Sequence, residues 1–190
     1  MNALESMISR RSTREYLDKD IPDEILKTLI QAAMHAPFGG KPLPQCQVFE
    51  AIIIRDNTMK QKLALEYKDR QFIRSAPVII ACLANKNNDL KYNEWNTSVA
   101  LSIENLIIAA ELQNIGSCFL SCFLNHAEHK NDKQLLRQIL NLPKHIELVG
   151  IVTLGYKNEK ETIPEKILRD FGDVVSYEKY GCDPNKAPGM

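Results

Sequence analysis

Apolar residues recur with the period of an α-helix in several segments of this chain. The first is a short amphipathic stretch that ends before Arg10 and carries Leu4, Met7 and Ile8 on its apolar face. Further helices are predicted over about 21–34, 57–67, 95–112 and 132–140. The helix that starts at Trp95 is apolar around most of its circumference, which is typical of a core or interface helix.

Continuous apolar runs predict four strands, over 47–55, 77–83, 117–123 and 147–155. Two of these runs, PVIIACL and ELVGIVTLG, show no polar alternation, as expected for strands that are covered on both faces. The links predicted between elements cover 35–45, 68–75 and 85–93. This pattern indicates an α+β fold, in which helices lie on the faces of a sheet.

The C-terminal segment, 156–190, is charged and has no clear core pattern. We interpret it as an arm that packs on another surface through four apolar anchors: Val174, Val175, Tyr177 and Tyr180. The chain length suits one domain with such an arm. We therefore expect a single domain over 1–181 and a flexible tail over 182–190.

The chain has 190 residues with 24 basic and 24 acidic side chains, so its formal net charge is zero. A dedicated nucleic-acid-binding protein would show a basic excess, and no apolar run is long enough for a membrane span. The start of the chain carries Glu5 and enters an amphipathic pattern directly, unlike a signal peptide. Five dispersed cysteines suggest no disulfide framework. We expect a soluble cytoplasmic protein without a nucleic-acid or membrane partner.

A cluster of positive charge follows the first predicted helix. Arg10, Arg11 and Arg14 surround Ser12 and Thr13. Guanidinium groups beside small hydroxyls supply the bidentate and compact donors that a phosphate binds. On these residues alone, the simpler interpretation is that the cations complement the helix dipole and stay solvated.

The Gly39-Gly40-Lys41 loop is a second candidate for ligand binding. Its glycines let main-chain N–H groups approach a ligand, and the lysine adds a positive charge. The loop matches neither the dinucleotide fingerprint nor the phosphate-binding loop of nucleotide hydrolases. Taken alone, it is first of all a turn.

Other chemistries have weaker support. Cys118, Cys122, His126 and His129 could ligate zinc, but their spacing matches no zinc module and buried cysteine usually acts as a small hydrophobe. A cysteine hydrolase that uses Cys46 is a remote alternative, since no serine sits in a nucleophile elbow either. No pair of carboxylates stands out for acid–base catalysis.

Five segments, in order along the chain, resemble the motifs of the FMN-dependent nitroreductases. Residues 10–16 (RRSTREY) are similar to the opening motif Arg-x-Ser-x-Arg-x-Phe/Tyr, and 36–49 resembles the loop that leads into the first strand. Residues 98–123 resemble the central helix, the Gly-x-Gly turn and the next strand. Residues 154–156 and 169–181 resemble the strand end and the C-terminal tail.

The resemblance implies an antiparallel-rich central sheet flanked by helices, in an intimate homodimer with FMN at the subunit interface. It implies hydride transfer from NADH or NADPH to the flavin, followed by reduction of a small electrophilic acceptor in a ping-pong cycle. Nitroaromatics, quinones and enones all suit such a site. The alternative is a flavin-binding dimeric protein that has lost turnover.

Matched by position, Arg10, Ser12 and Arg14 are implied to hold the FMN phosphate, ribityl chain and pyrimidine edge. Arg169, in the tail, is implied to reach the phosphate as well. We include the neighbouring Arg11 in the predicted cofactor site. A cation at the pyrimidine edge, here Arg14, would stabilise the reduced flavin.

Two further elements complete the predicted cofactor site. Leu120 and Ser121 match the strand end that passes near the isoalloxazine ring, and Gln71 matches a position near the ring's polar edge. The glycine loop described above, Gly39-Gly40-Lys41, is also included in the predicted cofactor site. The flavin carries the electrons, so no catalytic side chain is predicted.

The chain departs from the family pattern at several positions. Lys41 stands where asparagine is common, 42–44 (PLP) replaces a short link, and Cys46 replaces a tryptophan. Residues 121–122 replace a glycine-containing pair, and Asn114 replaces the first glycine of the turn. Asparagine tolerates the left-handed conformation, so we expect this last change to be mild. The others change the pocket wall and leave the acceptor open.

Overall fold

The computed structural model describes residues 2–39, 43–67, 70–89, 93–122 and 130–182. Its helices are α1 (Ala3–Ser9), α2 (Asp23–Met34), α3 (Asn57–Glu66), α4 (Gln71–Ser75), α5 (Trp95–Leu112), α6 (Lys130–Ile139) and α7 (Phe171–Val174). Its strands are β1 (Phe49–Ile54), β2 (Val78–Asn85), β3 (Ile115–Ser121) and β4 (Ile146–Tyr156). Two short 3-10 helices are η1 (Pro44–Cys46) and η2 (Lys86–Asn88).

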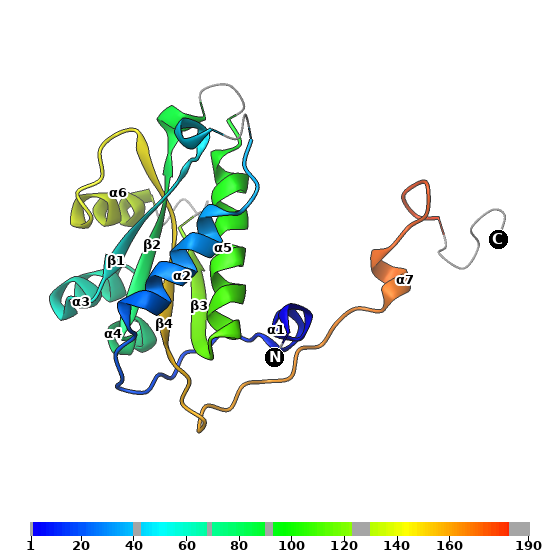
Figure 1. The fold of residues 1–190 in the computed structure, drawn as a ribbon, viewed down its shortest axis with the longest axis horizontal. Helices are drawn as coiled ribbons and strands as arrows, with labels where there is room; N and C mark the ends of the chain where they lie inside the picture. The colour runs from blue at the N-terminus through cyan, green and yellow to red at the C-terminus, as the bar shows by residue number, and fades with distance from the viewer. Residues whose placement is uncertain (1, 40–42, 68–69, 90–92, 123–129, 183–190) are drawn as a thin grey trace.

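The four strands form one antiparallel sheet in the order β1-β2-β4-β3. The central pair, β2 and β4, runs from Val78 opposite Leu154 to Asn85 opposite Ile146, with a bulge between Cys82 and Leu83. Helices α2 and α5 lie on one face of this sheet and α3, α4 and α6 on the other (Figure 1). The predicted α+β fold with an antiparallel sheet is therefore confirmed.

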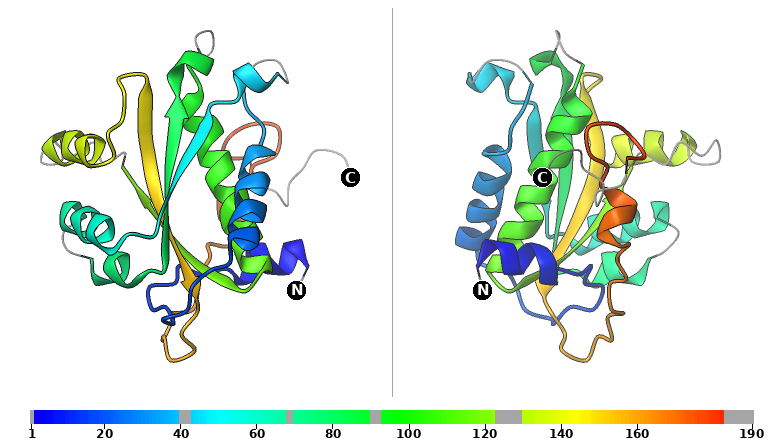
Figure 2. Two further views of the ribbon diagram at one scale, coloured as in Figure 1. Left: turned by 60° about the vertical axis from the view of Figure 1, so that its left-hand side comes forward. Right: turned by 90° about the vertical axis from the view of Figure 1, so that its right-hand side faces the viewer.

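Two apolar layers hold the helices to the sheet. On one face, α2 and α5 pack on the sheet through residues such as Leu29 and Leu106. On the other face, α3, α4 and α6 pack through residues such as Leu63, Ile73 and Leu136. Figure 2 shows the two groups of helices on opposite sides of the strands. Because both faces are covered, β2 is buried from Val78 to Ala84, as its unbroken apolar run predicts.

Several predicted boundaries need correction. Helix α3 ends at Glu66, one residue earlier than predicted, and its N-cap is Asp56, which accepts a hydrogen bond from the Met59 N–H at 2.8 Å. The predicted link 68–75 contains α4, which buries Ile73. The segment after α5 turns at Asn114, whose φ is 58°, so β3 begins earlier than predicted.

Smaller differences concern three short segments. Pro44 opens the 3-10 helix η1, where the sequence predicts no helix, because proline is compatible with a first helical turn. Residues 86–88 form η2 within the predicted polar loop. The last predicted helix starts before Asp132, at Lys130.

The segment that follows α1 is bound along the edge of the sheet. Ser12 forms a parallel bridge with Ser117, and the Thr13 N–H donates to the Ser117 carbonyl at 2.9 Å. Farther on, Tyr16 forms an antiparallel bridge with Lys157. Thr13 is fully buried against Gly116, where a Cβ atom would stand 2.7 Å from the Thr13 Oγ1. The cluster of arginines is therefore fixed to β3 and β4.

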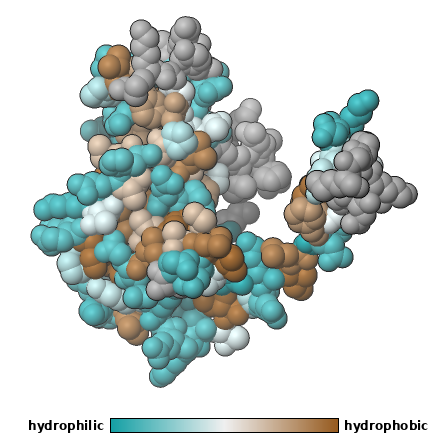
Figure 3. Space-filling view, turned by 45° about the vertical axis from the view of Figure 1, so that its right-hand side comes forward, coloured by the Kyte–Doolittle hydropathy of each residue, from teal (hydrophilic) through white to brown (hydrophobic). Residues whose placement is uncertain are grey.

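The C-terminal arm extends away from the sheet (Figure 1). No hydrogen bond joins 163–182 to the rest of the described chain. Of the predicted anchors, Val174 and Tyr180 are exposed, and apolar surface continues along the arm and onto the body beside it (Figure 3). The arm of one chain thus leaves its apolar side chains uncovered. Residues 183–190 of the predicted tail lie outside the described part.

In the described part of the chain, no helix combines the length and the apolar character that a membrane crossing requires.

Candidate functional site

One pocket joins three segments that are distant in the sequence. It has a volume of about 650 Å³ and is lined by the opening segment, by α4 and by the loop after β4. Its polar and aromatic lining residues include Arg14, Gln71, Phe72, Ser75, Asn158 and Glu161. Two of the predicted cofactor residues, Arg14 and Gln71, therefore meet in one cavity.

Arg14 provides the positive charge of this pocket. Its guanidinium carbon lies 5.9 Å from the centre of the Phe72 ring, and one of its Nη atoms donates to the Ser12 carbonyl at 3.4 Å. Its main-chain N–H donates to Oε1 of Glu161 at 2.9 Å. The exposed guanidinium makes no ion pair with the described acidic residues. It is available to an anionic or carbonyl-rich ligand.

A hydrogen-bonded group behind Arg14 holds the segment in place. The Tyr16 hydroxyl donates to the Thr13 carbonyl at 2.6 Å and lies 2.7 Å from the Thr153 hydroxyl. Burial raises the pKa of Tyr16 well above its ordinary value, so the phenol stays protonated. Burial also raises the pKa of the Cys118 thiol, and this effect is opposed by the positive charge of Arg14. Both groups are neutral structural elements at pH 7.

The two adjacent arginines have different surroundings. The Arg11 guanidinium turns back to α1 and donates to the carbonyls of Ile8, Ser9 and Arg10 at 2.9, 3.2 and 2.9 Å. It thereby satisfies carbonyls that the end of the helix leaves unpaired. The half-buried Arg10 side chain makes no hydrogen bond with the described residues, so its guanidinium remains available to a ligand.

Of the predicted glycine loop, the structure describes Gly39, which lies beside helix α5. The Gly39 N–H donates to the Ser98 hydroxyl of α5 at 3.4 Å. Gly39 is not among the described residues that line the Arg14 pocket. Gly40 and Lys41, the other two predicted residues of the loop, lie outside the described residues.

The strand-end residues lie beside the core. Leu120 is buried in the apolar layer on the α3 side, so its side chain faces other core residues. Ser121 is half-buried at the end of β3, opposite Gly150. Of these two predicted residues, Ser121 is therefore the one whose side chain reaches the surface at this strand end.

Arg169 lies in the arm, separate from the other arginines of its own chain. Its guanidinium donates to the carbonyl of Asp173, one turn further along. The predicted meeting of both ends of the chain at one phosphate site therefore does not occur within the described single chain.

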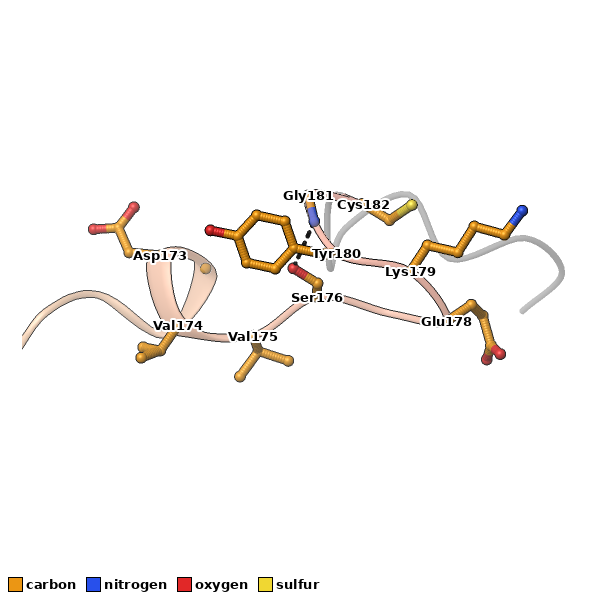
Figure 4. A pocket seen from close by; sticks show the side chains of 10 residues that line it. Asp173, Val174, Val175, Ser176, Glu178, Lys179, Tyr180, Gly181 and Cys182 are labelled. Carbon is orange, nitrogen blue, oxygen red and sulfur yellow. Dashed lines mark hydrogen bonds between the residues drawn. The ribbon is translucent and has the colours of Figure 1, made fainter.

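The arm forms a hollow of its own, of about 690 Å³. Its lining runs from Gly172 to Cys182, and the Gly181 N–H donates to the Ser176 hydroxyl at 3.0 Å across it (Figure 4). Because one exposed segment supplies the whole lining, this hollow brings together no groups from different elements. We therefore interpret this hollow as a bend of the arm and not as a ligand site.

The possible zinc ligands are only partly described. Cys118 is buried, and the Cys122 Sγ lies 2.6 Å from the Tyr67 hydroxyl. His126 and His129 lie outside the described residues. Within the described residues, no three side chains of metal-ligating type form a cluster.

Sequence reasoning missed several residues of the Arg14 pocket. Phe72 and Ser75 belong to a segment that was predicted to be a link, and Asn158 and Glu161 belong to the charged arm. The main-chain bond from the Asn158 N–H to the Glu15 carbonyl, 3.1 Å long, returns this loop to the opening segment. In the sequence, a polar loop after a predicted strand end is the one sign that these residues could belong to a site. That pattern does not show which other segment of the chain the loop contacts.

The comparison with known families is decisive. The nitroreductase family model matches residues 7–65 and 47–156. The chain belongs to the nitroreductase family. This nitroreductase-family chain is 29% identical over 178 residues to an Archaeoglobus fulgidus protein, a match that covers 93% of this chain and 98% of the relative. That relative carries the name "Putative NADH dehydrogenase/NAD(P)H nitroreductase".

Solved structures of nitroreductase-type proteins share the fold. A Parabacteroides distasonis protein of the same name has a TM-score of 0.80 at 23% identity, covering 95% of this chain and all, 100%, of that one. A Clostridium difficile protein titled an FMN-dependent nitroreductase has a TM-score of 0.77 at 23% identity, covering 93% and 99%. At these identities, the match establishes the fold.

Proposed function

We propose that this chain is an FMN-dependent oxidoreductase that takes hydride from NADH or NADPH and passes electrons to a small electrophilic acceptor. The observation that carries the proposal is the meeting of Arg14 and Gln71 in one cavity of a nitroreductase-family fold. The names of relatives, including an FMN-dependent nitroreductase and an NADPH-flavin oxidoreductase, support the same chemistry.

The donors in this part of the fold fit FMN. The arginines supply charge for a phosphate, and Ser12 supplies a hydroxyl beside them. The Arg14 guanidinium and the Gln71 amide in the pocket suit the carbonyl-rich pyrimidine edge of a flavin. Arg10, Ser12, Arg14 and Gln71 would hold the cofactor. Bound there, the flavin would accept hydride from the nicotinamide and reduce the acceptor in a second half-reaction.

We include a homodimer in the proposal, with FMN at the subunit interface. The exposed apolar residues of α1, namely Leu4, Met7 and Ile8, and those of the arm have no cover in the described single chain. A partner chain would bury both surfaces. Arg169, which lies apart from the other arginines of its own chain, could then supply its charge to a phosphate site across the interface.

The acceptor class follows from an open flavin site. Nitroaromatics, quinones and enones are small electrophiles that suit such a site. The chain departs from the family pattern between Lys41 and Cys46, and we propose that these departures bear on the choice among these acceptors. The five cysteines are all free, which supports a reducing cytoplasm as the location.

The first test is flavin content. We expect purified protein to be yellow, or to become so with added FMN, with one FMN per chain after gel filtration. Protein that takes up no FMN would overturn the proposal. Protein that binds FMN but reduces no acceptor with either nicotinamide would favour the flavin-binding alternative without turnover.

A further inference from the structure

Glu161 is a carboxylate held firmly inside the Arg14 pocket. The loop that carries it is joined to the opening segment at several points: the Leu17 N–H donates to the Tyr156 carbonyl at 2.9 Å, and the Asn158 N–H donates to the Glu15 carbonyl at 3.1 Å. Glu161 itself closes the loop through its bond with the Arg14 N–H. Its position is therefore set by the main-chain contacts that precede it in the loop and by its own side-chain bond to Arg14.

The charge of this carboxylate is not neutralised nearby. One oxygen accepts the Arg14 main-chain N–H at 2.9 Å, and the other is buried without a hydrogen-bond partner among the described residues. The described cations make no ion pair with it. Among the pocket's lining groups, its charged neighbours are Arg14 and the exposed Glu15. A buried carboxylate oxygen without a partner retains a strong local field.

Two opposite charges act on the same region of the site. Burial is the main cause that raises the pKa of the Cys118 thiol. The charge of Arg14 acts to lower this pKa, and the charge of Glu161 acts to raise it. The pKa of Tyr16 shows the same opposition, with burial as the main cause. Glu161 thus reduces the positive potential that Arg14 creates behind the pocket.

We propose that Glu161 is a positioning residue of the flavin site, which fixes the Arg14 main chain and lowers the reduction potential of the bound flavin by opposing the charge of Arg14. This inference rests on the proposed function. Reduction adds negative charge to the pyrimidine edge of a flavin. A cation there favours the reduced form, and a carboxylate that offsets the cation disfavours it. The carboxylate would therefore make the reduced cofactor a stronger donor to its acceptor.

Glu161→Gln separates the charge from the hydrogen bond. The amide oxygen can still accept the Arg14 N–H, so the loop is retained while the charge is lost. Glu161→Ala removes both. The control is Glu159→Gln, which removes a charge from an exposed neighbour that does not line the pocket.

The measurement is the two-electron midpoint potential of the FMN-loaded proteins, by spectroelectrochemical titration with redox dyes. We expect Glu161→Gln to favour reduction about tenfold, the order expected for removal of one charge near a partly buried group. This corresponds to a rise of about 30 mV. Glu159→Gln should match the wild type, and Glu161→Ala should also weaken FMN binding.

The outcomes distinguish the role of Glu161 from the proposed function of the chain. A Glu161→Gln potential equal to that of the wild type, in protein that binds FMN normally, would overturn the role of Glu161 and leave the proposed function standing. Equal shifts in Glu161→Gln and Glu159→Gln would also overturn it, because a general change of charge would then explain them. Wild-type protein that binds no FMN would overturn both proposals.

Discussion

The side chain of Thr13 lies directly over Gly116, so that a Cβ at position 116 would be 2.7 Å from Oγ1 and 2.8 Å from Cβ of the threonine. The contact is possible because glycine has no side chain. It brings the opening segment against β3 and lets the Thr13 N–H reach the Ser117 carbonyl. The positions of Ser12 and Arg14 depend on this close approach.

We predict that Gly116→Ala destabilises the protein by about 1–3 kcal/mol, since a methyl group must displace a buried side chain. The opening segment should shift with Thr13, so the affinity for FMN should fall as well. Urea unfolding and FMN fluorescence quenching measure the two effects. Lys27→Ala, at an exposed position of helix α2, is the control and should change neither quantity. An alanine at 116 with wild-type stability would show that Thr13 does not set the position of the segment.

The ion pair of Glu111 and Lys157 gives a second prediction. Lys157 Nζ lies 2.6 Å from Oε1 of Glu111, whose side chain is only 5% exposed. Lys157→Met should destabilise the protein by about 2–3 kcal/mol, because it leaves a buried carboxylate without its partner. In urea unfolding, the double variant Glu111→Gln/Lys157→Met should recover most of this loss. The ion pair would not account for the loss if the double variant lost as much stability as Lys157→Met and Glu111→Gln together.

Arg10 and Arg11 should respond differently to the same substitution. Arg10→Ala should weaken FMN binding about tenfold or more, as expected when a charge-assisted phosphate contact is lost. Arg11→Ala removes hydrogen bonds to the end of α1, so it should cost up to about 1 kcal/mol of stability with little effect on affinity. FMN titration and urea unfolding of both variants distinguish these effects.

Arg169→Ala, added to Arg10→Ala, should weaken FMN binding further if the arm supplies its charge to the phosphate site.

The interpretation of the two adjacent arginines would be wrong if Arg11→Ala reduced the affinity for FMN as much as Arg10→Ala.

The sequence predicts the long elements well and the short ones poorly. Helix α5, Trp95–Leu112, follows its predicted range because eighteen residues of steady apolar periodicity leave no competing pattern. Helix α4 was missed because it has five residues and buries only Ile73. In such a short element, tertiary contacts decide the conformation.

The residues of the site were also predicted only in part. The resemblance drew attention to Arg14 and Gln71, which do line one pocket. It could not separate Arg10 from Arg11, because the direction of each side chain depends on how α1 ends. Glu161 was also invisible, since its role depends on a bond to a residue 147 positions away. Loop residues acquire such partners only when the chain has folded.

If α1 lies in the proposed dimer interface, a charged residue on its apolar face should separate the two chains. Ile8 is 67% exposed on this helix, and Leu65 is 61% exposed on α3, on the other side of the molecule. Ile8→Glu should shift the protein from dimer to monomer, because it buries a charge in an apolar interface. Leu65→Glu should leave the dimer intact. Light scattering coupled to gel filtration measures both, and equal masses for the two variants would remove α1 from the interface.

The most direct test of the account is an anaerobic titration of the FMN-loaded protein with NADH and with NADPH, followed by absorbance of the flavin. We predict that at least one nicotinamide bleaches the flavin fully at about one equivalent, and that a quinone or nitroaromatic then restores the oxidised spectrum. A flavin that dithionite reduces but that neither nicotinamide bleaches would contradict the proposed oxidoreductase.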